Sequence, residues 1–176
     1  ELENVPQYQK KQEEYKLTYG KIISNMGSYY YQRKEYEEAL KWHKKALEFR
    51  KISLPDRVMD SYRTIMSDYF CMKQYEKGYE TYREAVKKTQ PDALFLVRAI
   101  GCELCLLKEK KEENLEKQIL EELPVQIERV VELAVSNRRM NVGVLKDLQK
   151  KLEELEAWTE LQELVKEYRT KIEEYL

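Results

Sequence analysis

Glycine and proline are scarce in this chain, with five and four copies in 176 residues. Both residues interrupt helices and supply tight turns, so their scarcity excludes a collagen-like or loop-rich chain. Charged residues make up 37% of the sequence instead. This composition favours long, solvated helices, and the length is sufficient for one all-α domain with its own core.

Cysteine and histidine are also rare. The three cysteines, Cys71, Cys102 and Cys105, are too few and odd in number for a disulfide framework, and they favour a reducing, cytoplasmic setting. No second cysteine pair accompanies Cys102 and Cys105, so a four-ligand zinc site is excluded. No nucleophile is recognisably paired with His43, the single histidine. We therefore predict no catalytic residue, no metal and no cofactor, and expect the protein not to be an enzyme.

Basic and acidic residues are nearly balanced in number, at 32 and 33. A duplex nucleic-acid surface needs a basic excess, so we expect no direct binding of nucleic acid by this segment. No apolar run is long enough to cross a bilayer, and we expect no membrane contact. The first residue is Glu1 rather than methionine, which predicts that a further domain precedes this segment in a longer protein.

Three of the prolines punctuate the chain at a nearly regular interval. Pro55, Pro91 and Pro124 are 36 and 33 residues apart, and the first two are each followed by aspartate. A Pro-Asp pair ends one helix and begins the next. A period in the thirties without strand signals indicates an array of helical repeats.

A shift of 39 residues superimposes two similar series. Large apolar residues recur at matching places, and small residues recur at Ala39 and Gly78 and at Ala46 and Ala85. Small residues let two helices approach closely while large ones fill the space between them. We therefore expect these four positions to be buried where helices cross.

The two segments "NMGSYYYQRKEYEEALKWHKKAL" and "IMSDYFCMKQYEKGYETYREAV" resemble the tetratricopeptide repeat. The resemblance implies a right-handed α-solenoid of about nine helices in a single domain over residues 1–176. The repeats would span approximately 20–55, 56–91, 92–124 and 141–176, with an extra helix over 125–138 that breaks the period. Residues 7–33 form one helix or two in this interpretation, with Gly20 as the candidate break.

In such arrays the first helix of each repeat lines a concave groove. Its register places Tyr30 on the buried seam and turns Tyr31 toward the groove. In the third repeat it also places Phe95, Cys102 and Cys105 on the inner wall. The residues that we predict to bind a partner on this wall are Lys21, Ser24, Asn25, Ser28, Tyr31, Gln32, Arg63, Ser67, Phe70 and Arg98.

This wall is chemically suited to a peptide. Asn25 and Gln32 can each supply a donor and an acceptor to an extended backbone, and arginine can hold a carboxylate with two parallel bonds. The predicted function is non-catalytic binding of a peptide or protein segment, in the interaction or signal-sensing part of a larger transcriptional regulator. The alternative is a scaffold for protein assembly or self-association, in which a homodimer would form through Tyr168 and Tyr175 near the C-terminus.

Overall fold

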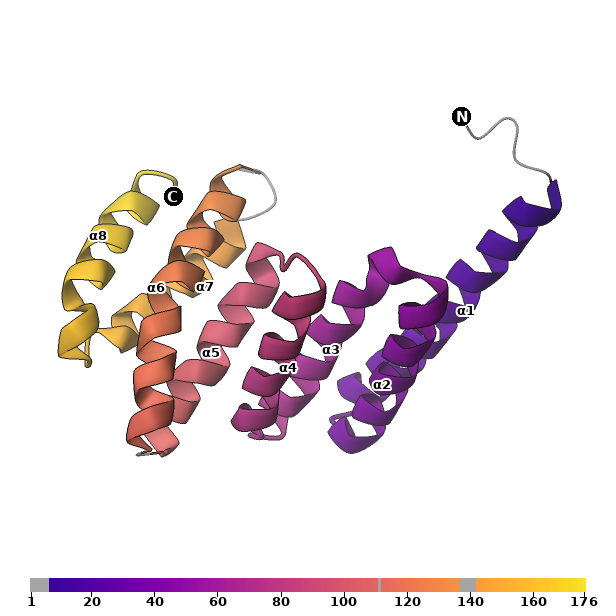
Figure 1. Ribbon diagram of the computed structural model, residues 1–176, viewed down its shortest axis with the longest axis horizontal. Helices are drawn as coiled ribbons and strands as arrows, with labels where there is room; N and C mark the ends of the chain where they lie inside the picture. The colour runs from indigo at the N-terminus through magenta and orange to yellow at the C-terminus, as the bar shows by residue number, and fades with distance from the viewer. Residues whose placement is uncertain (1–6, 111, 137–141) are drawn as a thin grey trace. The chain divides into compact units, whose positions relative to one another are not determined.

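The computed structural model describes residues 7–110, 112–136 and 142–176, which form eight α-helices (Figure 1). The chain packs as two compact units, residues 1–74 and 75–176. The first unit holds α1 (Gln7–Gln32), α2 (Tyr36–Ser53), a short 3₁₀ segment (Pro55–Arg57) and α3 (Val58–Cys71). The second holds α4 (Tyr75–Lys88), α5 (Ala93–Glu109), α6 (Glu113–Val135), α7 (Val142–Leu155), a 3₁₀ segment (Thr159–Leu161) and α8 (Gln162–Glu173). Successive helices pack in pairs, as in a tetratricopeptide-like array.

The α1–α2 pair is a tight helical hairpin. Residues 7–32 form one helix without a break at Gly20, which settles the alternative left open by the sequence. Gly27 faces His43 so closely that an added Cβ atom would lie 2.3 Å from His43 Cδ2. Ala39 and Ala46 are fully buried on α2, as expected for small residues at a helix crossing. Glycine and alanine therefore set the short distance between these two helices.

Two buried polar contacts join α2 to α3. His43 Nδ1 lies 2.6 Å from Asp68 Oδ2, and Arg50 Nη1 donates a 2.8 Å hydrogen bond to Ser61 Oγ. The two partners on each helix are seven residues apart, which is the register that antiparallel packing requires. Burial lowers the pKa of Arg50 and raises that of Asp68. Such groups need partners in the interior, so they fix how α2 and α3 align.

The turns after α1 and α3 confirm the 39-residue repeat. Lys34 and Lys73 both adopt positive φ angles, 63° and 57°. The backbone N–H groups of Glu35 and Gln74 donate to the carbonyls of Tyr30 and Tyr69, at 3.0 and 2.9 Å. These pairs are related by the same shift that aligns the two sequences. The repeat is thus a repeat of backbone geometry as well as of residue type.

In the second unit α5 is the central helix and packs against α4, α6 and α7. Asp92 caps it by accepting a 2.8 Å hydrogen bond from the Phe95 N–H, as the Pro-Asp signal predicts. Its apolar residues are buried on several sides, including Val97 and Ile100. Gly78 and Ala85 of α4 are buried as well, which confirms the expectation for all four small positions.

The expected extra helix over 125–138 is wrong, because α6 runs through Pro124 without a break. Proline costs a helix one hydrogen bond and some strain, so the sequence alone predicts an end there. The apolar face nevertheless continues across the proline, with Ile119, Leu123, Ile127 and Val130 fully buried. Burial of this face offsets the cost of the proline. The part of the expected helix beyond Ser136 lies outside the described residues.

The last pair, α7 and α8, packs through Leu148, Leu152, Val165 and Ile172, all of which are buried. Trp158 lies between the two helices, directly before the second 3₁₀ segment. Tyr168 is buried too, so it cannot be the exposed dimer contact that the sequence suggested. Among the helices of the described residues, none is both long and apolar enough to cross a membrane.

Candidate functional site

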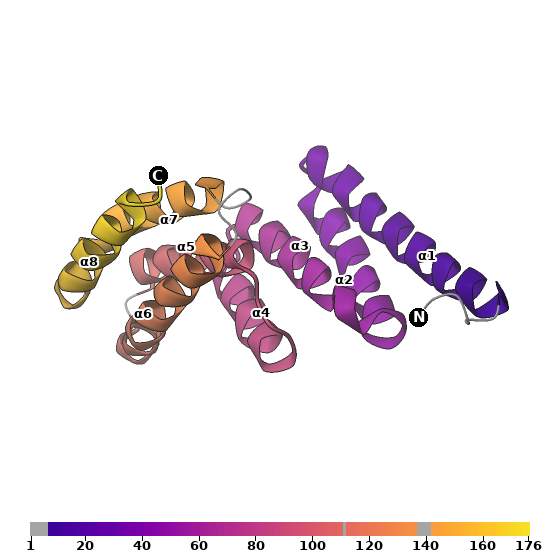
Figure 2. The same ribbon diagram turned by 90° about the horizontal axis from the view of Figure 1, so that it is seen from above.

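Helix α1, which lies beside α2 (Figure 2), presents three faces to its surroundings. Gly20, Ile23 and Gly27 face α2 and are buried. A second face carries the predicted wall residues, of which Lys21, Asn25 and Gln32 are exposed and Ser24, Ser28 and Tyr31 are half-buried. A third face carries exposed apolar side chains. The wall is therefore a polar, accessible surface of α1 that α2 does not cover.

Asn25 and Gln32 are exposed amide side chains on this wall. Within the part of the chain that the structure describes, neither side-chain amide makes a hydrogen bond. They are seven residues apart on one helix face, about 10.5 Å along the axis, which matches about three residues of extended chain. Lys21 lies one turn before Asn25 and adds a positive charge. The set offers donors and acceptors at a spacing that an extended peptide can meet.

Helix α3 contributes Arg63, Ser67 and Phe70. Arg63 Nη2 donates a 2.8 Å hydrogen bond to Asp60 Oδ1, so its charge already has an acidic neighbour. Ser67 donates to the Arg63 carbonyl at 3.0 Å, and on α1 Ser28 donates to the Ser24 carbonyl at 3.2 Å. The two serines therefore use their donors within their own helices. Phe70 is exposed and supplies an apolar contact surface.

Tyr31 joins the α1 and α3 parts of the wall. Its hydroxyl lies 3.2 Å from Cys71 Sγ, and its ring meets the Tyr36 ring edge-on at 5.4 Å. Burial raises the pKa of the Tyr36 hydroxyl, and the neighbouring Cys71 raises it further. Tyr30 is half-buried rather than part of the buried seam, and its ring packs edge-on against exposed Tyr29. The three consecutive tyrosines, Tyr29, Tyr30 and Tyr31, thus have three different surroundings.

Arg98 belongs to α5 in the second unit, where its side chain is half-buried. Phe95 and Cys102 on the same helix are fully buried and therefore do not form part of an accessible wall. This is a correction to the expected third segment, and its cause is that α5 packs on three neighbours. Burial raises the pKa of the Cys102 thiol to about 12, so this thiol is unreactive. In the ranges described, no cluster of His, Cys, Asp and Glu could hold a metal ion.

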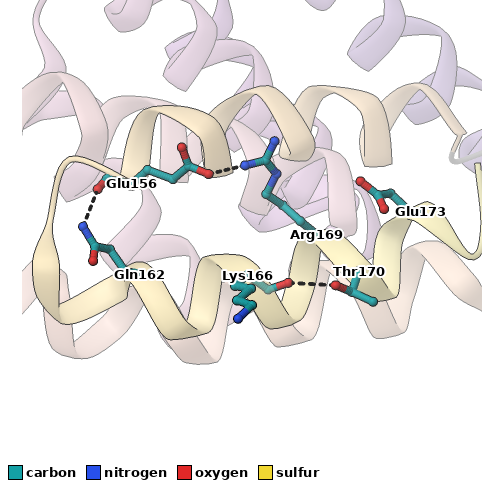
Figure 3. Close-up of a pocket in the computed structure, with 6 residues that line it drawn as sticks. All are labelled: Glu156, Gln162, Lys166, Arg169, Thr170 and Glu173. Carbon is teal, nitrogen blue, oxygen red and sulfur yellow. Dashed lines mark hydrogen bonds and ion pairs between the residues drawn. The ribbon is translucent and has the colours of Figure 1, made fainter.

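Two hollows in the second unit were not predicted. One, of about 520 Å³, lies beside α8 and is lined by Glu156, Gln162, Lys166, Arg169, Thr170 and Glu173 (Figure 3). The guanidinium of Arg169, the arginine that lines this hollow, is paired with Glu156. The hollow therefore offers no uncompensated positive charge from arginine to an anion. The other, of about 320 Å³, lies between α4 and α6, with Tyr82, Val86, Leu96 and Val125 among its lining residues.

A buried polar pair lies next to this second hollow. Gln126, which lines the hollow, donates a 2.6 Å hydrogen bond from Nε2 to Glu103 Oε1. Glu103 is fully buried on α5, and burial raises its pKa to about 8. A glutamate inside the apolar sequence of residues 93–107 is the signal that could have indicated this pair. The contact between His43 and Asp68 was not predicted from the sequence either.

Comparison with known proteins identifies part of the chain. A family model of the tetratricopeptide repeat matches residues 21–57, which comprise the second half of α1, all of α2 and the first 3₁₀ segment. No curated protein and no solved structure matches the chain. Residues 21–57 therefore form a tetratricopeptide repeat, close to the predicted first repeat of 20–55. Repeats of this class suggest a module for protein–protein interaction and are typically non-catalytic.

Proposed function

We propose that this chain is a non-catalytic module that binds a peptide or protein segment on the wall formed by α1 and α3. The observation that carries the proposal is the pair of accessible amides, Asn25 and Gln32, which make no hydrogen bond within the described residues. Both lie in the segment that matches the tetratricopeptide repeat. An extended segment would pair its backbone N–H and C=O groups with these two amides.

Charge defines the class of segment that this wall prefers. Lys21 is exposed on the same face, and no acidic side chain is bonded to it in the described residues. Arg63, in contrast, has Asp60 beside it. We therefore assign recognition of an acidic side chain or a free C-terminal carboxylate to Lys21 first, with Arg63 secondary. Tyr31 and Phe70 flank the polar groups and offer apolar contact area.

In the wider protein, this module would be the interaction or signal-sensing part of a larger transcriptional regulator that acts in the cytoplasm. The three cysteines are free, which suits a reducing compartment. Arg98 on α5, in the second unit, is a further residue that we propose to contact the bound segment. In this proposal a separate domain of the longer protein responds to the bound segment.

The test begins by selecting short peptides with free C-termini from a random library on the immobilised chain. Fluorescence anisotropy then measures their affinity for variants. Asn25→Ala together with Gln32→Ala is expected to weaken binding by roughly tenfold or more, since two hydrogen bonds are lost. Lys21→Glu is expected to lower the affinity for acidic peptides selectively. This loss of affinity should be smaller at high salt, because salt screens the interaction between charges.

The matched control removes two exposed amides elsewhere, Asn114→Ala together with Gln90→Ala. This variant should bind as the wild type does. Circular dichroism and urea unfolding should be unchanged in both double variants, because all four side chains are exposed. Equal affinity of the wall variant and the control variant for every selected peptide would refute the proposed wall.

A further inference from the structure

The N-terminal half of α1 extends beyond its packing partner. Helix α1 has 26 residues and α2 has 18. The end of α2 lies level with Gly20, because a Cβ atom added there would be 3.1 Å from Leu54 Cδ1 and 3.5 Å from the Phe49 ring. The side chains described between Gln7 and Tyr19 are exposed, apart from half-buried Lys16. Figures 1 and 2 both show this part of α1 continuing past α2.

An apolar stripe runs along α1 from this free arm into the packed half. It consists of Tyr15, Tyr19, Ile22, Met26 and Tyr29, spaced alternately by four and three residues. Their exposed fractions are 73% for Tyr15, 48% for Tyr19, 55% for Ile22 and 51% for Tyr29, and Met26 is half-buried. Spacing of four and three residues is the heptad pattern by which one helix packs along another. The stripe lies on a different face of α1 from the polar wall and beside the face that contacts α2, where Tyr19 meets Phe49.

A free helical arm of this length is marginal in water. Isolated helices shorter than roughly 12–15 residues are marginal in water, and helices in proteins are stabilised mostly by packing of an apolar face rather than by helix propensity. The arm has such a face but no partner for it among the described residues, apart from the edge-on contact of Tyr19 with Phe49 at 4.9 Å. The stripe therefore needs a second helix beside it.

We propose that this helix is α1 of a second copy of the chain, packed antiparallel so that each arm covers the other copy's stripe. One two-fold alignment places Tyr15 opposite Met26 of the partner subunit and Tyr19 opposite Ile22 of the partner subunit. Every stripe residue then meets an apolar or aromatic residue, Tyr29 excepted, which lies beside Gln12 of the partner subunit. This is the layering of antiparallel two-stranded packing.

Charge supports the same alignment. The arm sequence 10–16, "KKQEEYK", carries most of the charges near the stripe, whereas residues 22–32, "IISNMGSYYYQ", carry none. In the antiparallel alignment each charged residue of this arm sequence lies opposite the uncharged segment, so the charges of the two arms do not meet. A parallel alignment would place the two charged arms side by side, with Lys opposite Lys and Glu opposite Glu.

The area is adequate for a modest dimer. Taking 150–250 Å² for each full tyrosine, the exposed part of the stripe is roughly 500 Å² per copy before flanking residues are counted. Two copies together therefore bury about 1,000 Å² or more, which is the lower range of specific interfaces. The dimer should accordingly depend on concentration. The stripe is a face of α1 other than the wall, so this dimer goes beyond the proposed function.

Sedimentation equilibrium of the 176-residue chain over about 1–200 μM tests the proposal. We expect a monomer–dimer equilibrium, and Tyr15→Glu together with Ile22→Glu should raise its Kd by roughly tenfold or more. The matched control is Leu17→Glu, an exposed apolar residue of the same arm that lies off the stripe. It should leave the Kd unchanged. A monomer at every concentration, or a dimer weakened equally by both changes, would overturn the proposal.

Cysteine cross-linking tests the orientation. A chain carrying Tyr15→Cys and Met26→Cys should form a covalent dimer under mild oxidation, at a rate well above that of the wild type with its three native cysteines. Tyr15→Cys alone should not, because the antiparallel alignment keeps the two copies of residue 15 far apart. Efficient dimerisation of the Tyr15→Cys chain alone would contradict the antiparallel arrangement.

Discussion

His43 Nδ1 and Asp68 Oδ2 lie 2.6 Å apart, and both side chains are buried between α2 and α3. The contact connects the second helix of the matched repeat to the helix that follows it. Burial raises the pKa of Asp68, while hydrogen bonding and charge from His43 oppose that rise. The pair therefore depends on mutual compensation: either group alone would be an unpartnered polar group in an apolar interface.

Removing the acceptor should destabilise the first unit. We expect Asp68→Ala to lower the free energy of unfolding by about 3 kcal/mol, because His43 loses its buried partner. Asp68→Asn keeps an oxygen that can accept from Nδ1–H and should cost less than half as much. Urea unfolding followed by circular dichroism measures both. Equal losses in the two variants would mean that a neutral acceptor at residue 68 contributes nothing and that the contact depends on the charge of Asp68.

Gly27 and Gly143 form a matched pair of glycine-to-alanine tests. A Cβ atom at Gly27 would lie 2.3 Å from His43 Cδ2, and His43 is fixed by Asp68, so Gly27→Ala should cost about 2 kcal/mol. A Cβ atom at Gly143 would have nothing within 4 Å, and Gly143→Ala should stabilise α7 by about 0.5 kcal/mol. Thermal unfolding of both variants compares them. Destabilisation of similar size at both sites would refute the close α1–α2 approach.

The environment of a residue could be predicted from the sequence where the residue type alone decides it. The buried small residues Ala39, Ala46, Gly78 and Ala85 and the N-cap at Asp92 follow from local rules, and the structure confirms them. The register of the tetratricopeptide resemblance selected the wall residues of α1, of which Lys21, Asn25 and Gln32 are exposed, and their role in binding stays a prediction. The rest depends on tertiary packing. The neighbours of α5 determine that Phe95 is buried, and the partner of His43 is 25 residues away on another helix.

Proline predicts the end of a helix from the sequence, but packing can override this prediction, as it does at Pro124 in α6. If the continuous apolar face holds α6 together, Pro124→Ala should restore a backbone hydrogen bond without moving any buried side chain. We expect it to raise the stability of the second unit by about 1–2 kcal/mol, after allowing for the greater freedom of the unfolded chain. Urea unfolding measures this gain. A loss of stability would mean that the restriction that proline places on the unfolded chain outweighs the missing hydrogen bond.

We expect Glu103 to make the stability of the second unit depend on pH. Burial among apolar residues raises its pKa from an ordinary 4.5 to about 8, with Glu122 adding to the rise and the hydrogen bond from Gln126 opposing it. Tyr79 and Tyr82 of α4 also face this region: Tyr79 donates a 3.0 Å hydrogen bond to Glu122, and burial raises the pKa of both tyrosines. Glu103 is therefore mostly protonated in the folded protein at neutral pH, whereas it is ionised in the unfolded chain.

The sign of the pH effect follows from this difference. Between pH 4.5 and 8 the folded state binds more protons at Glu103 than the unfolded state does. Stability from this residue is therefore greatest below pH 4.5, falls by at most about 1.4 kcal/mol per pH unit as the pH rises, and stops falling above pH 8. Glu103→Gln removes the titration and should be more stable than the wild type at about pH 8 but not at about pH 5. Urea unfolding midpoints of the two proteins at both pH values measure this change. The control is Glu160→Gln at an exposed residue, whose difference in stability from the wild type should not change with pH. If the difference between wild type and Glu103→Gln is the same at both pH values, the carboxyl group does not ionise over this range and the raised pKa is wrong.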